Sequence, residues 1–249
     1  MMGKIYILGA GSFVARHLYE LLIKEQKDCV LLSRKELNFL NHDSFSNICF
    51  DNCVIIDFIN VNNGVEKDIM ACNYEGFTTF CNYLVKHAVN VHYIYMSTIS
   101  VIAEEFVKIN AYVRSKKMAE EKLLTSGLSN QLIRLSYPIG KGENKDRLIT
   151  RFIIKLKAGK EIEVTDTLIN LNDVRDVCKS IYEHLFKESV CFVSSNIYID
   201  LSEVVLYLKE QLGSGSSIKL SKAAFQFTPK TEKPFKPEYS IKQTLLNML

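Results

Sequence analysis

Short apolar runs alternate with amphipathic stretches along the first 140 residues. The apolar runs have the length of strands and are apolar on both faces; they are Ile5–Leu8, Cys29–Ser33, Cys53–Ile59, His92–Ser97 and Asn130–Ser136. Between them, the apolar spacing predicts helices over 13–24, 72–87 and 111–124, with a short helical piece near 43–48. Strands that are buried on both faces and separated by helices form a parallel sheet covered on both sides. The pattern therefore predicts an α/β fold with a doubly wound parallel sheet of the Rossmann type.

The pattern changes after Pro138. Residues 140–164 are basic and glycine-bearing, and a helix is predicted over 201–212, where the sequence GSGSS stops it. The tail TPKTEKPFKPEYS holds three of the four prolines and is expected to be an extended surface segment. We therefore expect a main domain formed by 1–137 with about 165–187, and a small lobe formed by 138–164 and 188–249.

Composition and charge exclude several classes of protein. The 249 residues are 47% apolar, and 31 basic residues against 28 acidic ones give a net charge of +3 without a long block of one sign. A disordered chain and a nucleic-acid-binding surface are therefore not expected. No apolar stretch is long enough for a membrane span, and the first apolar run turns at Gly9, too soon for a signal peptide. We expect a cytoplasmic protein.

The seven cysteines also indicate the cytoplasm. Their number is odd, and Cys29, Cys53, Cys178 and Cys191 stand in apolar surroundings, as buried free thiols do in a reducing environment. The closest pair, Cys49 and Cys53, lacks the spacing of a zinc-binding pair, so no metal site is expected.

Two glycines stand where the first strand gives way to the first helix. Gly9 and Gly11 would let the backbone approach a ligand, and a helix N-terminus offers unpaired N–H groups to a phosphate. The third glycine of the dinucleotide-binding fingerprint would fall at Val14 and is absent. The alternative is an ordinary strand–turn–helix junction. Because the turn follows the first strand and opens the first helix, we interpret it as a pyrophosphate site.

The end of the second strand bears on the choice of cofactor. Dinucleotide sites usually place Asp or Glu there for the ribose 2′-hydroxyl, whereas Arg favours a 2′-phosphate. This chain has Ser33, Arg34 and Lys35. The sequence therefore favours NADP(H) over NAD(H), unless the two basic residues are only solvated loop charges.

A tyrosine and a lysine four residues apart form the candidate catalytic pair. Tyr112 and Lys116 would share one face of the helix over 111–124. A second pair with the same spacing, Tyr137 and Lys141, spans Pro138 and a glycine, which prevents a helical face. The composition alone produces about one such pair by chance, so the spacing by itself proves nothing. Thr98 ends a strand, where ligands bind in open α/β sheets, although a turn hydroxyl is the common alternative.

In this order along the chain, these residues resemble the short-chain dehydrogenase/reductase superfamily, in its extended branch that modifies nucleotide sugars. Within it, the sequence is most similar to the dTDP-4-dehydrorhamnose reductases. The resemblance covers about residues 3 to 185. It rests on the glycine turn, the segments RKELNFLN, NYEGFT, LIRLSYPIG and LNDVRDV, the Ser97–Thr98 pair, and Tyr112 with Lys116.

The resemblance implies a set of site residues. It places the cofactor on Gly9, Gly11, Ser12, Phe13, Val14, Ser33, Arg34, Phe58, Lys116 and Pro138, the catalysis on Thr98, Tyr112 and Lys116, and the substrate on Thr98 and Tyr137, with the small lobe binding the substrate as well. The chain departs from the family at Asn38 and Asn41, which replace two aspartates. It departs again at Tyr137, where many relatives have Asn, and at Asp166, where epimerases have Arg.

The implied function is an NADP(H)-dependent reductase of a nucleotide-linked 4-keto-6-deoxy sugar. Two alternatives stay open: an NAD-dependent nucleotide-sugar epimerase or dehydratase that recycles its cofactor, and a non-catalytic dinucleotide sensor. Relatives often pair two helices across a two-fold axis. A homodimer is therefore expected, with Phe77, Phe80, Leu123 and Leu124 offering apolar surface, unless all of these side chains face the sheet.

Overall fold

The computed structural model describes residues 3–103 and 110–249, which divide into two compact units. The first unit comprises 1–135 and 181–191, and the second comprises 136–180 and 192–249. The sequence pattern assigns about 165–187 to the main domain, whereas in the structure residues up to Ser180 cluster with the second unit.

A six-stranded sheet organises the first unit, in the order β10-β5-β4-β3-β1-β2. Its strands are β1 (Lys4–Leu8), β2 (Cys29–Leu32), β3 (Cys53–Asp57), β4 (Val91–Thr98), β5 (Ser129–Leu135) and β10 (Val190–Val193). The pairs from β2 to β5 are all parallel. This confirms the predicted fold class. The strand order reverses between β1 and β3, so the first unit has its topological switch point at the carboxyl ends of these two strands.

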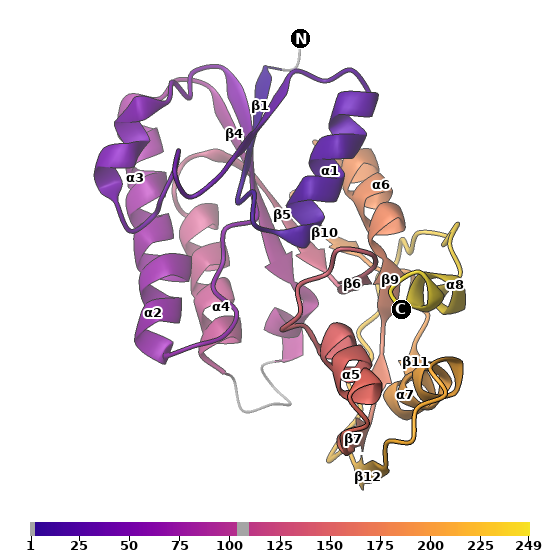
Figure 1. Ribbon diagram of the computed structural model, residues 1–249. Helices are drawn as coiled ribbons and strands as arrows, with labels where there is room; N and C mark the ends of the chain where they lie inside the picture. Colours follow the sequence, from indigo (N-terminus) through magenta and orange to yellow (C-terminus); the bar gives the residue numbers. More distant parts are fainter. Residues whose placement is uncertain (1–2, 104–109) are drawn as a thin grey trace. The chain divides into compact units, whose positions relative to one another are not determined.

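Helices cover both faces of the sheet. One face carries α2 (Glu66–Met70), α3 (Phe77–His87) and α4 (Ala111–Leu124), and the other carries α1 (Phe13–Lys24) (Figure 1). Short helical turns η1 (His42–Asn47), η2 (Ala71–Gly76) and η3 (Ile99–Ala103) join these elements, and α6 (Val174–His184) precedes β10. Two of the long helices begin at side-chain caps, since Ser12 accepts from the amide of Ala15 and Asn110 from that of Val113.

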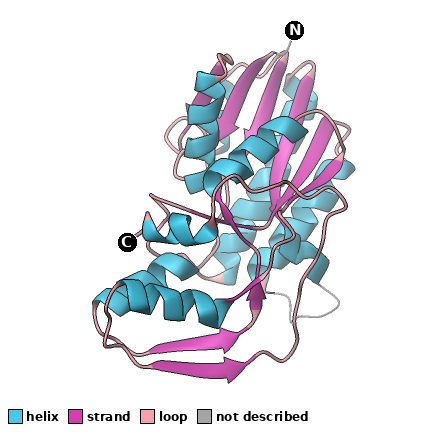
Figure 2. Cartoon of the chain, turned by 90° about the vertical axis from the view of Figure 1, so that its right-hand side faces the viewer, coloured by secondary structure: helices cyan, strands magenta, loops and turns pink. Residues whose placement is uncertain are grey.

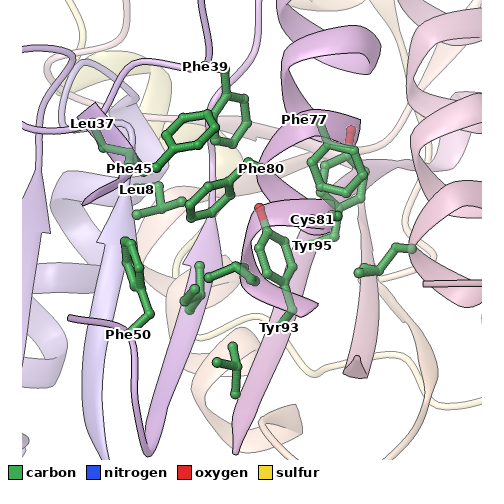
Figure 3. Packing of buried hydrophobic residues seen from close by; sticks show 14 of the residues in the cluster. Leu8, Leu37, Phe39, Phe45, Phe50, Phe77, Phe80, Cys81, Tyr93 and Tyr95 are labelled. Carbon is green, nitrogen blue, oxygen red and sulfur yellow. The ribbon is translucent and has the colours of Figure 1, made fainter. Parts of the chain in front are cut away.

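An aromatic cluster fills the space between the sheet and α3 (Figure 3). The ring of Phe80 contacts those of Phe39, Phe45, Phe50 and Tyr93 at centroid distances of 5.0–6.3 Å. Gly76 permits this packing, because a Cβ there would lie 2.6 Å from the carbonyl oxygen of Phe39. The loop after β2 is thereby packed directly against the turn that precedes α3.

This packing corrects part of the dimer expectation. Phe77, Phe80 and Leu123 are fully buried in the core, and of the four residues named only Leu124 is exposed. The expectation that all four offer apolar surface is wrong, because the apolar stripes of α3 and α4 face the sheet. The homodimer itself stays a prediction.

The second unit is built from short strand pairs and helices, and it includes residues 174–180 of α6 (Figure 2). Its strands pair as β6 (Tyr137–Ile139) with β9 (Leu171–Asp173), β7 (Ile162–Asp166) with β12 (Ile218–Lys222), and β8 (Leu168–Ile169) with β11 (Ile199–Asp200). Helices α5 (Leu148–Lys157), α7 (Leu201–Gln211) and α8 (Ile241–Leu246) bury an apolar core with Ile162 and Val164. The tail after β12 is irregular until α8, which begins at Ile241 and is capped by Ser240.

The expectation for four of the cysteines is confirmed. Cys29, Cys53, Cys178 and Cys191 are buried free thiols. Across residues 3–103 and 110–249, no helix combines the length and apolar character needed to cross a membrane.

Candidate active site

The turn after β1 is held between its two neighbouring strands. The amides of Gly9 and Ala10 both donate to the carbonyl of Leu32 at 3.0 Å, which ties the turn to the end of β2. Gly9 has φ +90°, and a Cβ there would lie 3.1 Å from the carbonyl carbon of Phe58 after β3. Only glycine fits this conformation and this close approach. The turn therefore lies at the switch point, where an α/β sheet binds its ligands.

The N-terminus of α1 is open to a ligand at Gly11. A Cβ built on Gly11 meets no atom within 4 Å, so this glycine lies in unobstructed space. The side chains of Phe13 and Val14 are buried, and hence only their backbone could face an anion. The first turn of a helix presents amide groups and the positive end of its dipole, an arrangement that suits a pyrophosphate.

The end of β2 presents both a cation and an anion. Arg34 is exposed. Burial raises the pKa of the Cys72 thiol in η2, and the positive charge of Arg34 partly opposes this rise, so the guanidinium lies near η2. Glu36 folds back onto Ser33, whose amide donates to its carboxylate at 2.8 Å and whose hydroxyl donates to the same oxygen. This carboxylate was not predicted from the sequence.

A buried aspartate, also missed from the sequence, ends β3. Asp57 is fully buried and accepts from the hydroxyl of Tyr93 and the amide of Ile59, both at 2.7 Å. Burial raises the pKa of Asp57 to about 6, against the lowering effects of Lys116 and of the two hydrogen bonds. The contact with Ile59 fixes the loop that carries Phe58 toward the glycine turn.

Two hydroxyl residues end β4. Thr98 is half-buried, and its hydroxyl donates to the Ser100 hydroxyl and accepts from the Ser100 amide, both at 3.2 Å. Ser97 is buried, and its Oγ has no hydrogen-bond partner within the described residues. A buried polar atom without a partner is costly, so a ligand group at the end of β4 would satisfy Ser97.

Tyr112 and Lys116 lie one turn apart on α4, as the sequence predicts. Tyr112 is half-buried in the first turn, whereas Lys116 is 1% exposed. The Lys116 Nζ donates to the carbonyl of Met96 on β4 at 2.8 Å and lies 4.4 Å from the centroid of the Tyr95 ring. Burial lowers the pKa of Lys116 to about 8, although the carboxylates of Asp57 and Glu120 oppose this shift.

Two polar contacts fix α4 beside the sheet. The guanidinium of Arg134 on β5 binds the Glu120 carboxylate through both oxygens, at 3.0 and 2.5 Å. Asn73 in η2 accepts from the amide of Val61, and its side-chain amide donates to the carbonyl of Val61 and to the hydroxyl of Ser115. In the sequence, Asn73 stands out only as part of the segment NYEGFT. Its partners lie 12 and 42 residues away, so no local pattern signals this role.

The remaining expected residues belong to the second unit. The hydroxyl of Tyr137 accepts from the amide of Leu148 at 3.0 Å, at the start of α5, and Arg147 lies 4.6 Å from its ring centroid. The carbonyl of Pro138 accepts from Arg147 at 2.7 Å. The Tyr137 hydroxyl and the Pro138 carbonyl thus contact the first turn of α5 and the residue before it. Asp166 at the end of β7 has a raised pKa because of the nearby Asp200 carboxyl.

Comparison with known sequences assigns the chain to a family. The profile of the NAD dependent epimerase/dehydratase family matches residues 5–186, well over half of the chain. The chain belongs to this family. It is therefore an NAD(P)-dependent enzyme of the short-chain dehydrogenase/reductase type, which confirms the resemblance and the expectation of a nicotinamide dinucleotide. No curated protein matched the sequence.

Solved structures share the fold of this family member. RMD from Pseudomonas aeruginosa, complexed with NADPH, is 20% identical with a TM-score of 0.77, and 98% of each chain is covered. WbmG from Bordetella bronchiseptica, in complex with NAD and UDP, is 14% identical with a TM-score of 0.77, covering 100% of this chain and 94% of that one. The UDP-glucose 4-epimerase of Thermus thermophilus, in complex with NAD, is 12% identical with a TM-score of 0.75, covering 97% and 96%. At these identities, the likeness concerns the fold alone.

Proposed function

We propose that this epimerase/dehydratase family member is an NADP(H)-dependent reductase of a nucleotide-linked 4-keto-6-deoxy sugar. The observation that carries the proposal is the position of Lys116, buried beneath the end of β4 and one helical turn from Tyr112. Burying an ammonium group costs desolvation free energy, and groups with strongly shifted pKa values cluster at active sites.

The residues at the switch point fit a nicotinamide dinucleotide. Gly9 and Gly11, with the amides at the start of α1, would hold the pyrophosphate, and Phe58 would border it across the turn. Ser33 and Arg34 would contact the adenosine ribose, and Lys116 the ribose at the nicotinamide end. The bound cofactor supplies a hydride. For Pro138, a backbone contact to the cofactor stays a proposal.

The chain would then supply the proton and the charge. Tyr112 would donate its phenolic proton to the oxygen of the sugar ketone as that oxygen gains negative charge, and solvent would later reprotonate the phenolate. An unperturbed tyrosine, with a pKa of about 10, is too weak an acid for this role near pH 7. The Lys116 ammonium favours the phenolate and so lowers the barrier. Thr98 would orient the ketone by a hydrogen bond, and Tyr137 stays a proposed substrate-binding residue.

Two observations support the choice of NADPH and of a nucleotide sugar. Arg34 is an exposed guanidinium directly after Ser33, able to bind a 2′-phosphate with a charge-assisted hydrogen bond. Among the structures with this fold, RMD binds NADPH and WbmG binds NAD and UDP. The proposed enzyme is cytoplasmic and acts as a homodimer.

An NAD-dependent epimerase or dehydratase is the second candidate. It is favoured by the Glu36 carboxylate beside Ser33, because an acidic group near the end of the second strand suits a ribose 2′-hydroxyl. Such an enzyme oxidises and reduces the same sugar within one turnover, and its cofactor undergoes no net change.

Net consumption of NADPH separates the candidates. We expect the protein to oxidise NADPH stoichiometrically with a 4-keto-6-deoxy sugar nucleotide made in situ, and to release the 4-hydroxy sugar. Conversion of the sugar nucleotide without loss of NADPH absorbance would overturn the reductase in favour of the epimerase or dehydratase. Binding of a dinucleotide without turnover of any sugar nucleotide would exclude both enzymes and favour the non-catalytic dinucleotide sensor.

A further inference from the structure

The carboxylate of Glu36 lies close to the place where the adenosine ribose would bind. Leu32 pairs with Leu8 in the sheet, and its carbonyl accepts from the amides of both Gly9 and Ala10. Ser33 therefore follows directly after the residue to which the glycine turn is tied. The ribose that links a pyrophosphate on this turn to its adenine lies toward the end of β2 in open α/β sheets.

Glu36 occupies the donors that a 2′-phosphate would need. Its Oε2 accepts from both the amide and the hydroxyl of Ser33. These two hydrogen bonds lower the pKa of the Glu36 carboxyl, so it is ionised at neutral pH. A 2′-phosphate would have to displace this carboxylate from Ser33 or lie beside it as a second anion. A ribose 2′-hydroxyl, by contrast, can donate to it.

A purely structural role is the alternative. Ser33 and Glu36 have the spacing of a capping box, in which such contacts stabilise a turn. However, the turn is already held by the amides of Glu36 and Leu37, which both donate to the carbonyl of Ser33. It is also anchored by Leu37, which is 1% exposed. The exposed Glu36 carboxylate is therefore not needed to form the turn.

We propose that Glu36 is a specificity-determining residue that opposes the 2′-phosphate and favours the free ribose, against the opposite effect of Arg34. This inference rests on the proposed function, since it assumes that a nicotinamide dinucleotide binds at the switch point. The sequence RKE thus carries the two opposing groups within three residues, and the ratio of NADPH to NADH affinity is set by their balance.

The test measures dissociation constants for NADPH and NADH with the unmodified protein and with Glu36→Gln and Arg34→Ala. In Glu36→Gln we expect NADPH to bind more tightly and NADH more weakly, with the ratio shifted about tenfold toward NADPH, as for one charge-assisted hydrogen bond. Arg34→Ala should shift the ratio the other way. A role confined to stabilising the turn would weaken both dinucleotides together, so opposite changes distinguish selection from structure.

Glu25→Gln is the matched control. It removes the same charge at the exposed C-terminal cap of α1, at the opposite end of that helix from the glycine turn, and should leave the ratio unchanged. A second probe, 2′-AMP against 5′-AMP, reports the phosphate effect without the nicotinamide half. An unchanged ratio in Glu36→Gln, with both dinucleotides bound, would overturn this inference and leave the proposed function intact. Failure of the unmodified protein to bind either dinucleotide would overturn both.

Discussion

Two regions of this chain have the same Y-x-x-x-K spacing and entirely different surroundings. Tyr112 and Lys116 lie on α4, where the lysine is buried against β4. Tyr137 lies on β6, and Lys141 is exposed in the turn that follows, next to Gly140 with φ +155°. The spacing acquires a chemical meaning only where a helix places both side chains on one face. The difference also predicts what each pair should do when it is changed.

The largest expected effect is on hydride transfer. Tyr112→Phe removes one hydroxyl, and single-turnover hydride transfer from NADPH to a 4-keto sugar nucleotide should fall by about 100- to 10,000-fold, as for a lost general acid. NADPH affinity should be preserved. In Tyr137→Phe the rate of transfer should stay within a few-fold of normal, and any change should appear in substrate affinity.

If Tyr112→Phe kept full hydride-transfer activity, the first pair would have no more catalytic role than the second. Tyr112 and Lys116 would then be the accidental match that the composition allows.

The next largest effect concerns stability at alkaline pH. Lys116 has a pKa of about 8 in the folded protein and about 10.5 when unfolded. Between these values the unfolded chain binds a proton that the folded chain does not, so raising the pH favours the folded state. The free energy of unfolding should therefore rise by up to about 3 kcal/mol between pH 8 and 10.5, relative to Lys116→Met.

Urea denaturation at several pH values measures this contribution. Lys141→Met is the control, because Lys141 is exposed and its removal should leave the alkaline rise in place. Parallel curves for the unmodified protein and Lys116→Met would mean that the ammonium is not buried in solution.

A smaller effect is expected on NADPH affinity, which should differ between variants of Lys116 and Lys141. Lys116→Met removes the group proposed to hold the ribose at the nicotinamide end, and NADPH should bind about tenfold more weakly or worse, as for a lost charged hydrogen bond. Lys141→Met should bind NADPH normally. Equal affinities for both variants, measured by the quenching of intrinsic tyrosine fluorescence or by calorimetry, would exclude Lys116 from the cofactor site.

The first unit follows closely from its sequence, because its elements have a regular apolar period. The predicted helices 13–24 and 111–124 coincide with α1 and α4. The predicted helix 72–87 begins earlier, at Glu66, and is interrupted by a π-helical turn at 71–76. That turn lets Asn73 reach Val61 and Ser115, which are long-range contacts that no local period encodes.

The second unit was predicted less well, although part of its signal was present. The basic, glycine-bearing composition of residues 140–164 does not by itself predict a helix, yet Ile149, Phe152, Ile153 and Leu156 have helical spacing and form the buried face of α5. Its strands have two to five residues, too short for a period to be recognised. In the first unit, the strand pattern that ends at Ser33 does not indicate the position of the Glu36 carboxylate, because its contact with Ser33 depends on the capping-box spacing of the turn that follows.

The smallest expected effect tests whether Tyr137 stabilises its own unit. Its hydroxyl accepts from the Leu148 amide at the start of α5, where Arg147 provides no side-chain cap for the helix. Tyr137→Phe leaves this amide without its acceptor, and the free energy of unfolding should fall by about 1 kcal/mol. Lys141→Met, four residues away and exposed, should change it by less than about 0.5 kcal/mol. Equal stabilities of Tyr137→Phe and the unmodified protein in urea would mean that water replaces the hydroxyl at this amide.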